Sequence, residues 1–212
     1  MHERLLVIDY DATITEDDVL DRAAMTFAET HVVTEETGAL DGSPLTLHDV
    51  LRLEYAAVRS PRHEVIEWVL ANARIRAGFH DLVALASNRG WPLVVLSSGF
   101  HTLIAPVLER EGLGALTVIA NDVQPHPDGW KVTFRDESMC EVCGEACKRR
   151  TLCELEPASE VVYVGDGYSD RCAATAADRV FARSGLARYL SDRSVTFARF
   201  ETFHEIVAQL SE

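Results

Sequence analysis

The chain has 212 residues, of which 47% are hydrophobic, and a formal net charge of −14 from 34 acidic and 20 basic residues. This length suits one globular domain with room for an insertion, and the apolar fraction suits a protein with a real core. The acidic balance disfavours nucleic acid and anionic membranes as partners, because both are bound through basic surfaces. The sequence contains neither an 18-residue apolar run nor a secretion signal, so we expect a cytoplasmic protein.

The chain opens with a hydrophobic run that ends in two acids. Residues 4–9 (RLLVID) are typical of a buried strand, and Asp9 and Asp11 stand at its end. Two carboxylates at this spacing repel each other, so the fold must place positive charge close to them.

Residues 16–77 have a helical pattern of hydrophobic residues, with Leu20, Ala24 and Phe27 on one face. We find no strand pattern in this stretch. The sequence therefore predicts a helical insertion over 16–77 in a core domain made of residues 1–15 and 78–212.

Strands and helices alternate after Gly78. Strands are predicted over 92–96, 116–120, 130–134, 161–164 and 180–181, and helices over 79–89, 101–111 and 203–210. This alternation predicts an α/β fold with a Rossmann-like parallel sheet covered by helices on both faces.

Polar residues follow three of the predicted strands, at the edge where open α/β sheets bind ligands. Asp9 and Asp11 follow the first of these strands, Ser97 the second, and Asp166 and Asp170 the third. A lysine in a helix-like stretch, Lys148, lies between the last two in sequence. Each residue alone is a weak signal, because an aspartate after a strand often caps a helix and a lysine is usually solvated. Their combination in this order is a much stronger one.

These motifs resemble those of the haloacid dehalogenase superfamily, in the phosphatase branch with a helical cap after the first motif. DYDAT (residues 9–13) matches the first motif, Ser97 the second, Lys148 the third and residues 165–170 the fourth. The helical insertion occupies the place of the cap in phosphoserine phosphatase. The segments ARIRAGF (73–79) and CEVCGEACK (140–148) are most similar to methylthiopentenyl-phosphate phosphatases and, more distantly, to phosphocholine and phosphoethanolamine phosphatases.

The resemblance implies a phosphatase that hydrolyses a small phosphorylated metabolite through an aspartyl-phosphate. Asp9 would be the nucleophile and Asp11 the general acid and base. Asp9, the main-chain carbonyl of Asp11 and Asp166 would hold Mg²⁺, which favours a few carboxylates with water and phosphate oxygens. An acid at position 11 also favours phosphate esters over carbon–halogen bonds, because an alcohol leaves with a proton and a halide does not.

The resemblance also assigns groups that hold the phosphate. Ser97 and Lys148 would hold the phosphoryl oxygens, and Asp170 would orient Lys148 or a metal-bound water. Ser98 and Gly99 would offer main-chain N–H groups, and the adjacent hydroxyls leave open whether Ser97 or Ser98 binds phosphate. The chain departs from the family at Ala12 and Ser98, where glycine is usual, and at Ser169, where asparagine is usual.

The insertion is expected to select the substrate. Asp18 stands where phosphoserine phosphatases carry an acid that meets the substrate ammonium, although an acid there also stabilises the start of a helix. Arg76, or Arg74 beside it, is expected to meet a second anionic group of the substrate, with a surface role as the alternative.

Five cysteines, an odd number in a chain without an export signal, disfavour a disulfide framework. Three of them have a spacing that zinc accepts, namely Cys140, Cys143 and Cys147. Cys153 or His126 would have to supply a fourth ligand, and the alternative is a set of reduced thiols beside Lys148. Cys172 is expected in the core.

Two other functions remain compatible with these motifs. A phosphotransferase would pass the phosphoryl group from Asp9 to an alcohol instead of water. A non-catalytic sensor of a phosphorylated ligand would not need Asp9 and Asp11 together. The sequence leaves open whether the protein is a monomer or a homodimer.

Overall fold

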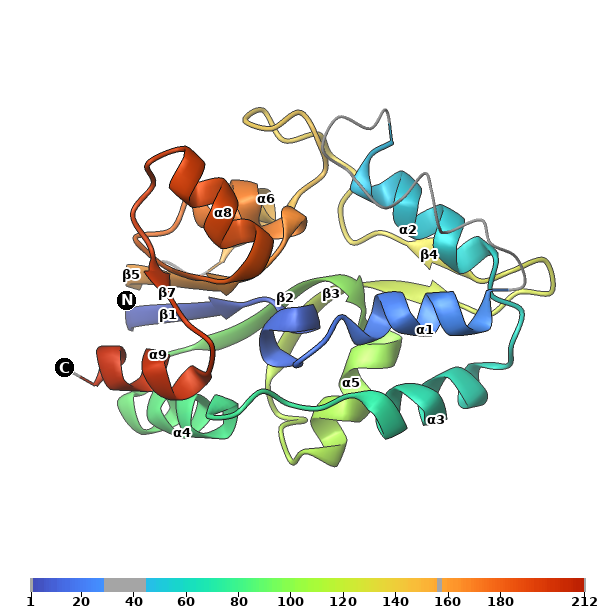
Figure 1. Ribbon diagram of the computed structural model, residues 1–212, viewed down its shortest axis with the longest axis horizontal. Helices are drawn as coiled ribbons and strands as arrows, with labels where there is room; N and C mark the ends of the chain where they lie inside the picture. Colours follow the sequence, from blue (N-terminus) through green and yellow to red (C-terminus); the bar gives the residue numbers. More distant parts are fainter. Residues whose placement is uncertain (1, 29–44, 156–157, 212) are drawn as a thin grey trace.

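The computed structural model describes residues 2–28, 45–155 and 158–211 and confirms the α/β fold (Figure 1). Within these residues a seven-stranded sheet has the order β4-β3-β2-β1-β5-β6-β7, parallel except for β4. Its strands are β1 (His2–Ile8), β2 (Leu93–Phe100), β3 (Thr117–Gln124), β4 (Lys131–Thr133), β5 (Ala158–Gly165), β6 (Arg179–Ala182) and β7 (Ala198–Arg199).

Strand β1 lies at the centre because its hydrophobic run can be buried on both faces. Alternate side chains of a strand point to opposite faces of the sheet. Leu6 and Ile8 therefore enter one hydrophobic core, and Leu5 and Val7 enter the other. Asp9 emerges at the carboxyl end of this buried strand.

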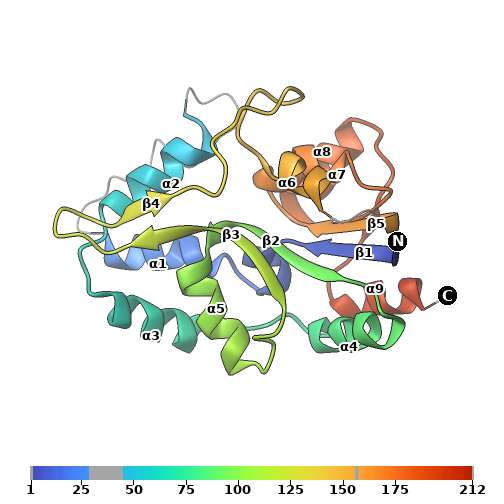
Figure 2. The same ribbon diagram turned by 180° about the vertical axis from the view of Figure 1, so that it is seen from behind.

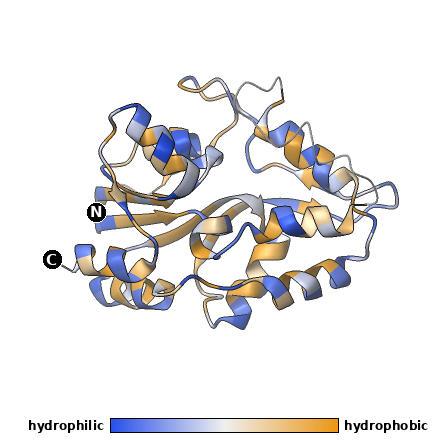
Figure 3. Ribbon diagram, viewed as in Figure 1, coloured by the Kyte–Doolittle hydropathy of each residue, from blue (hydrophilic) through white to orange (hydrophobic). Residues whose placement is uncertain are grey.

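Two layers of helices cover the sheet (Figures 1 and 2). One layer consists of α4 (Phe79–Arg89), α5 (His101–Arg110) and α9 (Phe203–Leu210), and the other of α6 (Lys148–Glu154), α7 (Arg171–Ala174) and α8 (Ser184–Asp192). The strands between these layers are mostly hydrophobic (Figure 3). Among the described residues, we find no helix with the length and apolar character needed to cross a membrane.

The helical insertion leaves and rejoins the core through two adjacent segments. It follows a turn, η1 (Tyr10–Ile14), and its described helices are α1 (Val19–Phe27), α2 (Leu47–Ala56) and α3 (Arg62–Asn72). Thr15 and Ile75 form an antiparallel bridge at its base, and the N–H of Glu16 donates to the carbonyl of Arg74 at 2.9 Å. Helix α2 packs beside β4, so the insertion covers the carboxyl edge of the sheet. The expected helical pattern over 29–44 lies outside the described residues.

The predicted helices 79–89 and 203–210 match α4 and α9, whereas other elements differ from the sequence prediction. Strand β2 continues to Phe100, past the predicted end at residue 96, because its polar SSG segment stays in the sheet. Helix α8 was not predicted, since it begins with Ser184 at a φ of 46° and Gly185, which are poor helix signals. The two-residue strand β7 carries no periodic pattern.

Candidate active site

The residues predicted from the strand ends come together at one edge of the sheet. Asp9 follows β1, Ser97 lies within β2, and Asp166 follows β5. Because β1 pairs with both β2 and β5, these side chains meet beyond the central strand. Lys148, the first residue of α6, reaches the same place from the side.

Lys148 is the centre of this arrangement. Its side chain is fully buried, and its ammonium donates to Asp9 Oδ1 and, at 2.7 Å, to Asp170 Oδ1. Burial alone would lower the pKa of Lys148, but the carboxylates of Asp170 and Asp9 outweigh it and raise this pKa. Lys148 therefore stays charged against Asp9.

Asp170 holds Lys148 and the loop after β5. Its Oδ1 also accepts from the Tyr163 hydroxyl at 2.8 Å, and its Oδ2 accepts the N–H groups of Asp166 and Gly167 at 2.9 and 3.0 Å. Of the two roles that the resemblance implies for Asp170, the structure has the contact with Lys148. The glycine at 165 fits this packing, because a β-carbon there would lie 2.6 Å from the Asp170 carboxyl.

The acids around Asp9 fit a divalent cation. Burial raises the pKa of Asp9 well above its ordinary value, with Asp170 and Asp166 adding to this and Lys148 opposing it. Burial and Asp170 raise the pKa of Asp166 to about 7, and among the described residues the Asp166 carboxylate accepts only from the Thr13 hydroxyl, at 3.0 Å. Carboxylate oxygens of Asp9, Asp166 and Asp170 lie within 4.8 Å of one another. Since Asp170 is already engaged, Asp9 and Asp166 are the pair that suits Mg²⁺.

Asp11 lies at the start of the insertion, in a turn with unusual backbone angles. Its Oδ1 accepts the N–H of Leu20 at 3.2 Å, and Ala12 after it has a φ of 53°. This left-handed region favours glycine, which explains why a glycine is usual at position 12. Burial, followed by Asp18 and Asp9, raises the pKa of Asp11 well above its ordinary value and so favours its protonated form.

Ser97 faces the site from β2 and is 1% exposed. Its hydroxyl oxygen accepts the N–H of Gly99 at 2.8 Å. A β-carbon on Gly99 would lie 2.4 Å from Leu20 Cδ1 and 3.1 Å from Asp11 Oδ2, so the close approach of the insertion requires glycine here. Ser98 also lines the pocket, and its carbonyl accepts from the Asn121 side chain at 2.7 Å.

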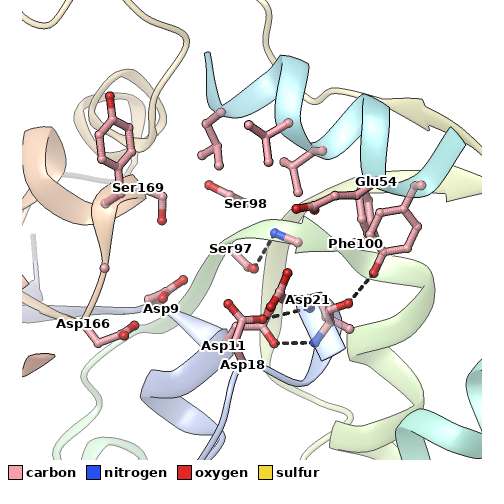
Figure 4. Close-up of a pocket in the computed structure, with 18 residues that line it drawn as sticks. Asp9, Asp11, Asp18, Asp21, Glu54, Ser97, Ser98, Phe100, Asp166 and Ser169 are labelled. Atoms are coloured by element: carbon pink, nitrogen blue, oxygen red, sulfur yellow. Dashed lines mark hydrogen bonds between the residues drawn. The ribbon is translucent and has the colours of Figure 1, made fainter. Parts of the chain in front are cut away.

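A pocket of about 290 Å³ opens between this catalytic edge and the insertion (Figure 4). Its near wall is formed by Asp9, Asp11, Ser97 and Asp166, and its far wall carries three more acids, Asp18, Asp21 and Glu54. Over the described residues, no lysine or arginine lines this pocket. The volume suits a small molecule, and the far wall suits a positive charge on it.

Glu54 and Asp18 are the acids of the far wall with the most perturbed pKa values. Glu54, on α2, is 6% exposed, and burial with the nearby Asp21 and Asp18 raises its pKa to about 8. Within the described chain, no hydrogen bond or ion pair is found for its carboxyl group. Asp18 caps α1 by accepting the N–H of Asp21 at 3.0 Å, and limited hydration inside the pocket raises its pKa to about 6. Asp18 thus stabilises the start of α1 and also lines the pocket, and its contact with a substrate ammonium stays a prediction.

Arg76 does not line this pocket. It is 8% exposed, and its guanidinium donates to the carbonyls of Thr13 and Thr15 at 2.8 Å and to those of Ala12 and Glu16 at 2.9 Å. The expectation that Arg76 meets the substrate is therefore corrected: the arginine holds the turn that carries Asp11. Its neighbour Arg74 is exposed and donates to nearby main-chain carbonyls, also away from the pocket.

Sequence reasoning missed several residues of the site. Tyr163 looked like an ordinary strand residue, although its hydroxyl contacts Asp170. Thr13 belongs to the first motif, and that position was its only signal. Glu54 and Asp21 lie on two different helices of the insertion, and in sequence each has the pattern of a surface acid. Only the relative positions of the two helices show that both acids line the pocket.

Several known proteins are similar to this chain over most of its length. Residues 6–175 match the family model of haloacid dehalogenase-like hydrolases. A polyol phosphate phosphatase of Saccharomyces cerevisiae is 28% identical to this chain. The alignment covers 100% of this chain and 94% of the length of that protein. A 2-hydroxy-3-keto-5-methylthiopentenyl-1-phosphate phosphatase of Brevibacillus brevis is also 28% identical, over 98% of this chain and 95% of its own.

Solved structures show the same fold at lower identity. A phosphoserine phosphatase with a phospho-aspartyl intermediate analogue has a TM-score of 0.72 and 21% identity, with 99% of each chain covered. Apo phosphoserine phosphatase has a TM-score of 0.71 and 16% identity, with 98% of each chain covered. The chain therefore belongs to the haloacid dehalogenase-like hydrolase family. Its fold is that of the phosphoserine phosphatases.

Proposed function

We propose that this protein hydrolyses a small phosphomonoester in a Mg²⁺-dependent reaction through an aspartyl-phosphate on Asp9. One observation carries this proposal: the buried Lys148 ammonium lies between Asp9 and Asp170, and Asp9 lines the pocket together with Asp11. A strand-end carboxylate held against a buried cation suits attack on an anionic phosphoryl group.

In the first step, an oxygen of the Asp9 carboxylate attacks phosphorus, and the bond between phosphorus and the alcohol oxygen breaks. Asp11 gives its proton to the departing alcohol oxygen. The raised pKa of Asp11 supports this role, since the proton must be present at the start of the reaction. Lys148 lies beside the attacking oxygen and stabilises the charge on the transferring group.

In the second step, Asp11 takes a proton from a water molecule, and this water attacks phosphorus. The bond between phosphorus and Asp9 breaks, inorganic phosphate leaves, and both carboxyl groups return to their starting states. Ser97 and Ser98, which line the pocket with Gly99, would bind phosphate oxygens. Bound Mg²⁺, held by Asp9, Asp166 and the Asp11 carbonyl, would supply charge neutralisation for the phosphate.

The far wall of the pocket suggests which alcohol leaves. Asp18, Asp21 and Glu54 place three carboxyl groups on the side away from Asp9 and Asp166 (Figure 4). Glu54 is buried and has no partner among the described residues, so its ionisation costs free energy unless a cation binds there. We therefore propose that the helical segment 16–77 acts as a specificity cap and selects alcohols that carry an ammonium group.

The reaction is tested by measuring phosphate release from p-nitrophenyl phosphate with Mg²⁺. We expect Asp9→Asn to lower the rate by at least about 10³-fold, because the amide is a poor nucleophile. The matched control is Asp17→Asn, at an exposed acid outside the pocket, which should keep the wild-type rate. Activity that survives in Asp9→Asn would contradict the mechanism.

Substrate class is tested with two phosphomonoesters that differ in one group. We expect kcat/KM to be at least about tenfold higher for 2-aminoethyl phosphate than for 2-hydroxyethyl phosphate, because only the former places an ammonium against the far wall. Equal values would refute the cationic specificity and leave the phosphatase reaction intact. Adding small alcohols as acceptors and analysing the products separates hydrolysis from phosphotransfer.

A further inference from the structure

Four of the five cysteines converge on one point outside the active-site pocket. Cys140, Cys143 and Cys147 come from the loop between β4 and α6, and Cys172 comes from α7. All four Sγ atoms lie within 4.8 Å of one another, and those of Cys140 and Cys172 are 3.9 Å apart. The sequence suggested the first three but not the fourth: Cys172 is buried as expected, yet its thiol faces the cluster. Neither Cys153, exposed on α6, nor His126, in the turn between β3 and β4, joins them.

The spacing of the sulfur atoms suits one tetrahedral zinc ion. Zinc–sulfur bonds of about 2.3 Å in a tetrahedron separate the sulfur atoms by about 3.8 Å. The 3.9 Å between Cys140 and Cys172 already matches this value. A disulfide would need two sulfur atoms about 2.0 Å apart and would leave the other thiols without a function. Four thiol ligands are also the number that closes a structural zinc site.

The loop offers the hydrogen bonds that zinc thiolates use. The main-chain N–H groups of Val142 and Cys143 point at the Cys140 sulfur, and the N–H of Arg149 points at the Cys147 sulfur. Gly144 closes the turn with a φ of 74°, and its N–H donates to the Cys140 carbonyl at 2.8 Å. Such donors orient metal-bound thiolates and stabilise their charge.

The same loop has little hydrophobic packing, although polar side chains such as Arg135 and Glu145 connect it to the core. Residues 135–147 contain no helix or strand, and the side chains of Met139 and Val142 are 63% and 65% exposed. A loop of this length without secondary structure normally needs a specific anchor. Hydrophobic packing does not supply one for these residues.

We propose that Cys140, Cys143, Cys147 and Cys172 bind one structural Zn²⁺. Binding converts four thiols to thiolates and releases four protons, and the Arg149 guanidinium, 3.3 Å from the Cys172 carbonyl, lies close to the resulting negative charge. Cys147 directly precedes Lys148, and Cys172 follows Asp170 by two residues. The zinc ion therefore ties together the two segments that supply the Lys148–Asp170 contact, in the region where α6 and α7 lie side by side (Figure 2).

The test is the metal content of the full chain, purified without added metal under reducing conditions. We expect about one zinc ion per chain in the wild type and less than about a tenth of one in Cys143→Ser, which removes an exposed ligand. Cys153→Ser is the matched control, an exposed cysteine outside the cluster, and should keep its zinc. A wild-type protein that has no zinc and takes up none after incubation with ZnCl₂ and desalting would overturn the proposal, as would stoichiometric iron in its place.

A second measurement covers the case in which Cys143→Ser does not fold. Titrating metal-free, reduced wild-type protein with Co²⁺ should produce the visible absorption bands of a tetrahedral cobalt thiolate, and added Zn²⁺ should remove them. Weak octahedral cobalt absorption would overturn the assignment of four cysteine ligands. Both readouts are independent of phosphatase activity, so they stand or fall separately from the proposed reaction.

Discussion

The substitution Glu54→Gln separates the stability of this fold from its substrate selection. Glu54 is 6% exposed, and burial, with the charges of Asp21 and Asp18 nearby, raises its pKa from the ordinary 4.5 to about 8. A glutamine of nearly the same shape cannot ionise but keeps the packing. We therefore expect the variant to be more stable than the wild type near neutral pH and less selective for cationic substrates.

The direction follows from proton binding. Between about pH 4.5 and pH 8 the folded protein keeps the proton of Glu54 while the unfolded chain loses it, so wild-type stability falls as the pH rises through this range. Each pH unit between the two pKa values contributes about 1.36 kcal/mol, which gives about 3 kcal/mol at pH 7 and about 5 kcal/mol above pH 8. Glutamine has no such dependence. The advantage of the variant should therefore be small at pH 5 and large at pH 8.

The assay is urea unfolding of wild type and variant at pH 5 and pH 8, with Glu67→Gln as the matched control on an exposed face of α3. The control should change stability by less than about 0.5 kcal/mol at either pH. The same proteins are compared on 2-aminoethyl and 2-hydroxyethyl phosphate, and Glu54→Gln should lower the ratio of their kcat/KM values. A stability difference that is equal at pH 5 and pH 8 would refute the reasoning, because it would mean that Glu54 ionises normally in the folded protein.

Three further results are expected. Gly99→Ala should fold but lose about 100-fold in kcat, because the new β-carbon would displace Leu20, 2.4 Å away; an unchanged kcat with an unchanged melting temperature would contradict this contact. Arg76→Met should lower the free energy of unfolding, measured by urea titration, by about 3 kcal/mol, because it leaves the buried carbonyls of the turn before α1 unpaired. A rise in KM without loss of stability would point instead to substrate binding. EDTA should abolish phosphatase activity and added Mg²⁺ restore it, because Asp9 and Asp166 need a cation; activity that persists in EDTA would argue against the metal.

The parts of the fold that the sequence reveals are those that rest on local patterns. RLLVI, residues 4–8, is buried on both faces and reads as a central strand in any context. Helix α4 is predicted at its observed bounds, because Gly90 ends it in a left-handed conformation with a φ of 67°. Helix α8 is not predicted, because it begins at Ser184 with a φ of 46°, a conformation that no local sequence pattern indicates.

The site divides in the same way. Asp9 follows β1 and Ser97 lies within the neighbouring β2, so a parallel sheet brings them to one edge, whereas Lys148 lies on α6 and is assigned to the site by the resemblance to the family. Arg76 was misread because an arginine near a hinge looks like an anion receptor, whereas its partners are main-chain carbonyls that no side-chain pattern encodes. The cluster partner of Cys140 was missed for the corresponding reason: Cys172 is 32 residues away in sequence and meets it only through the packing of α7 against α6.

The charge of the pocket explains why these features occur together. Lys148 is shared by Asp9 and Asp170, so its single positive charge is already used before a substrate enters. Burial, with neighbouring carboxylates after it, raises the pKa values of Asp11, Asp18 and Asp166, and no lysine or arginine of the described residues lines the pocket. A phosphate dianion could enter such a site only with a divalent cation on the Asp9 side, and an ammonium group on its other end would relieve the repulsion at Glu54. The two ends of the pocket thus require opposite charges of the ligand, and a small aminoalkyl phosphate bound with Mg²⁺ provides both.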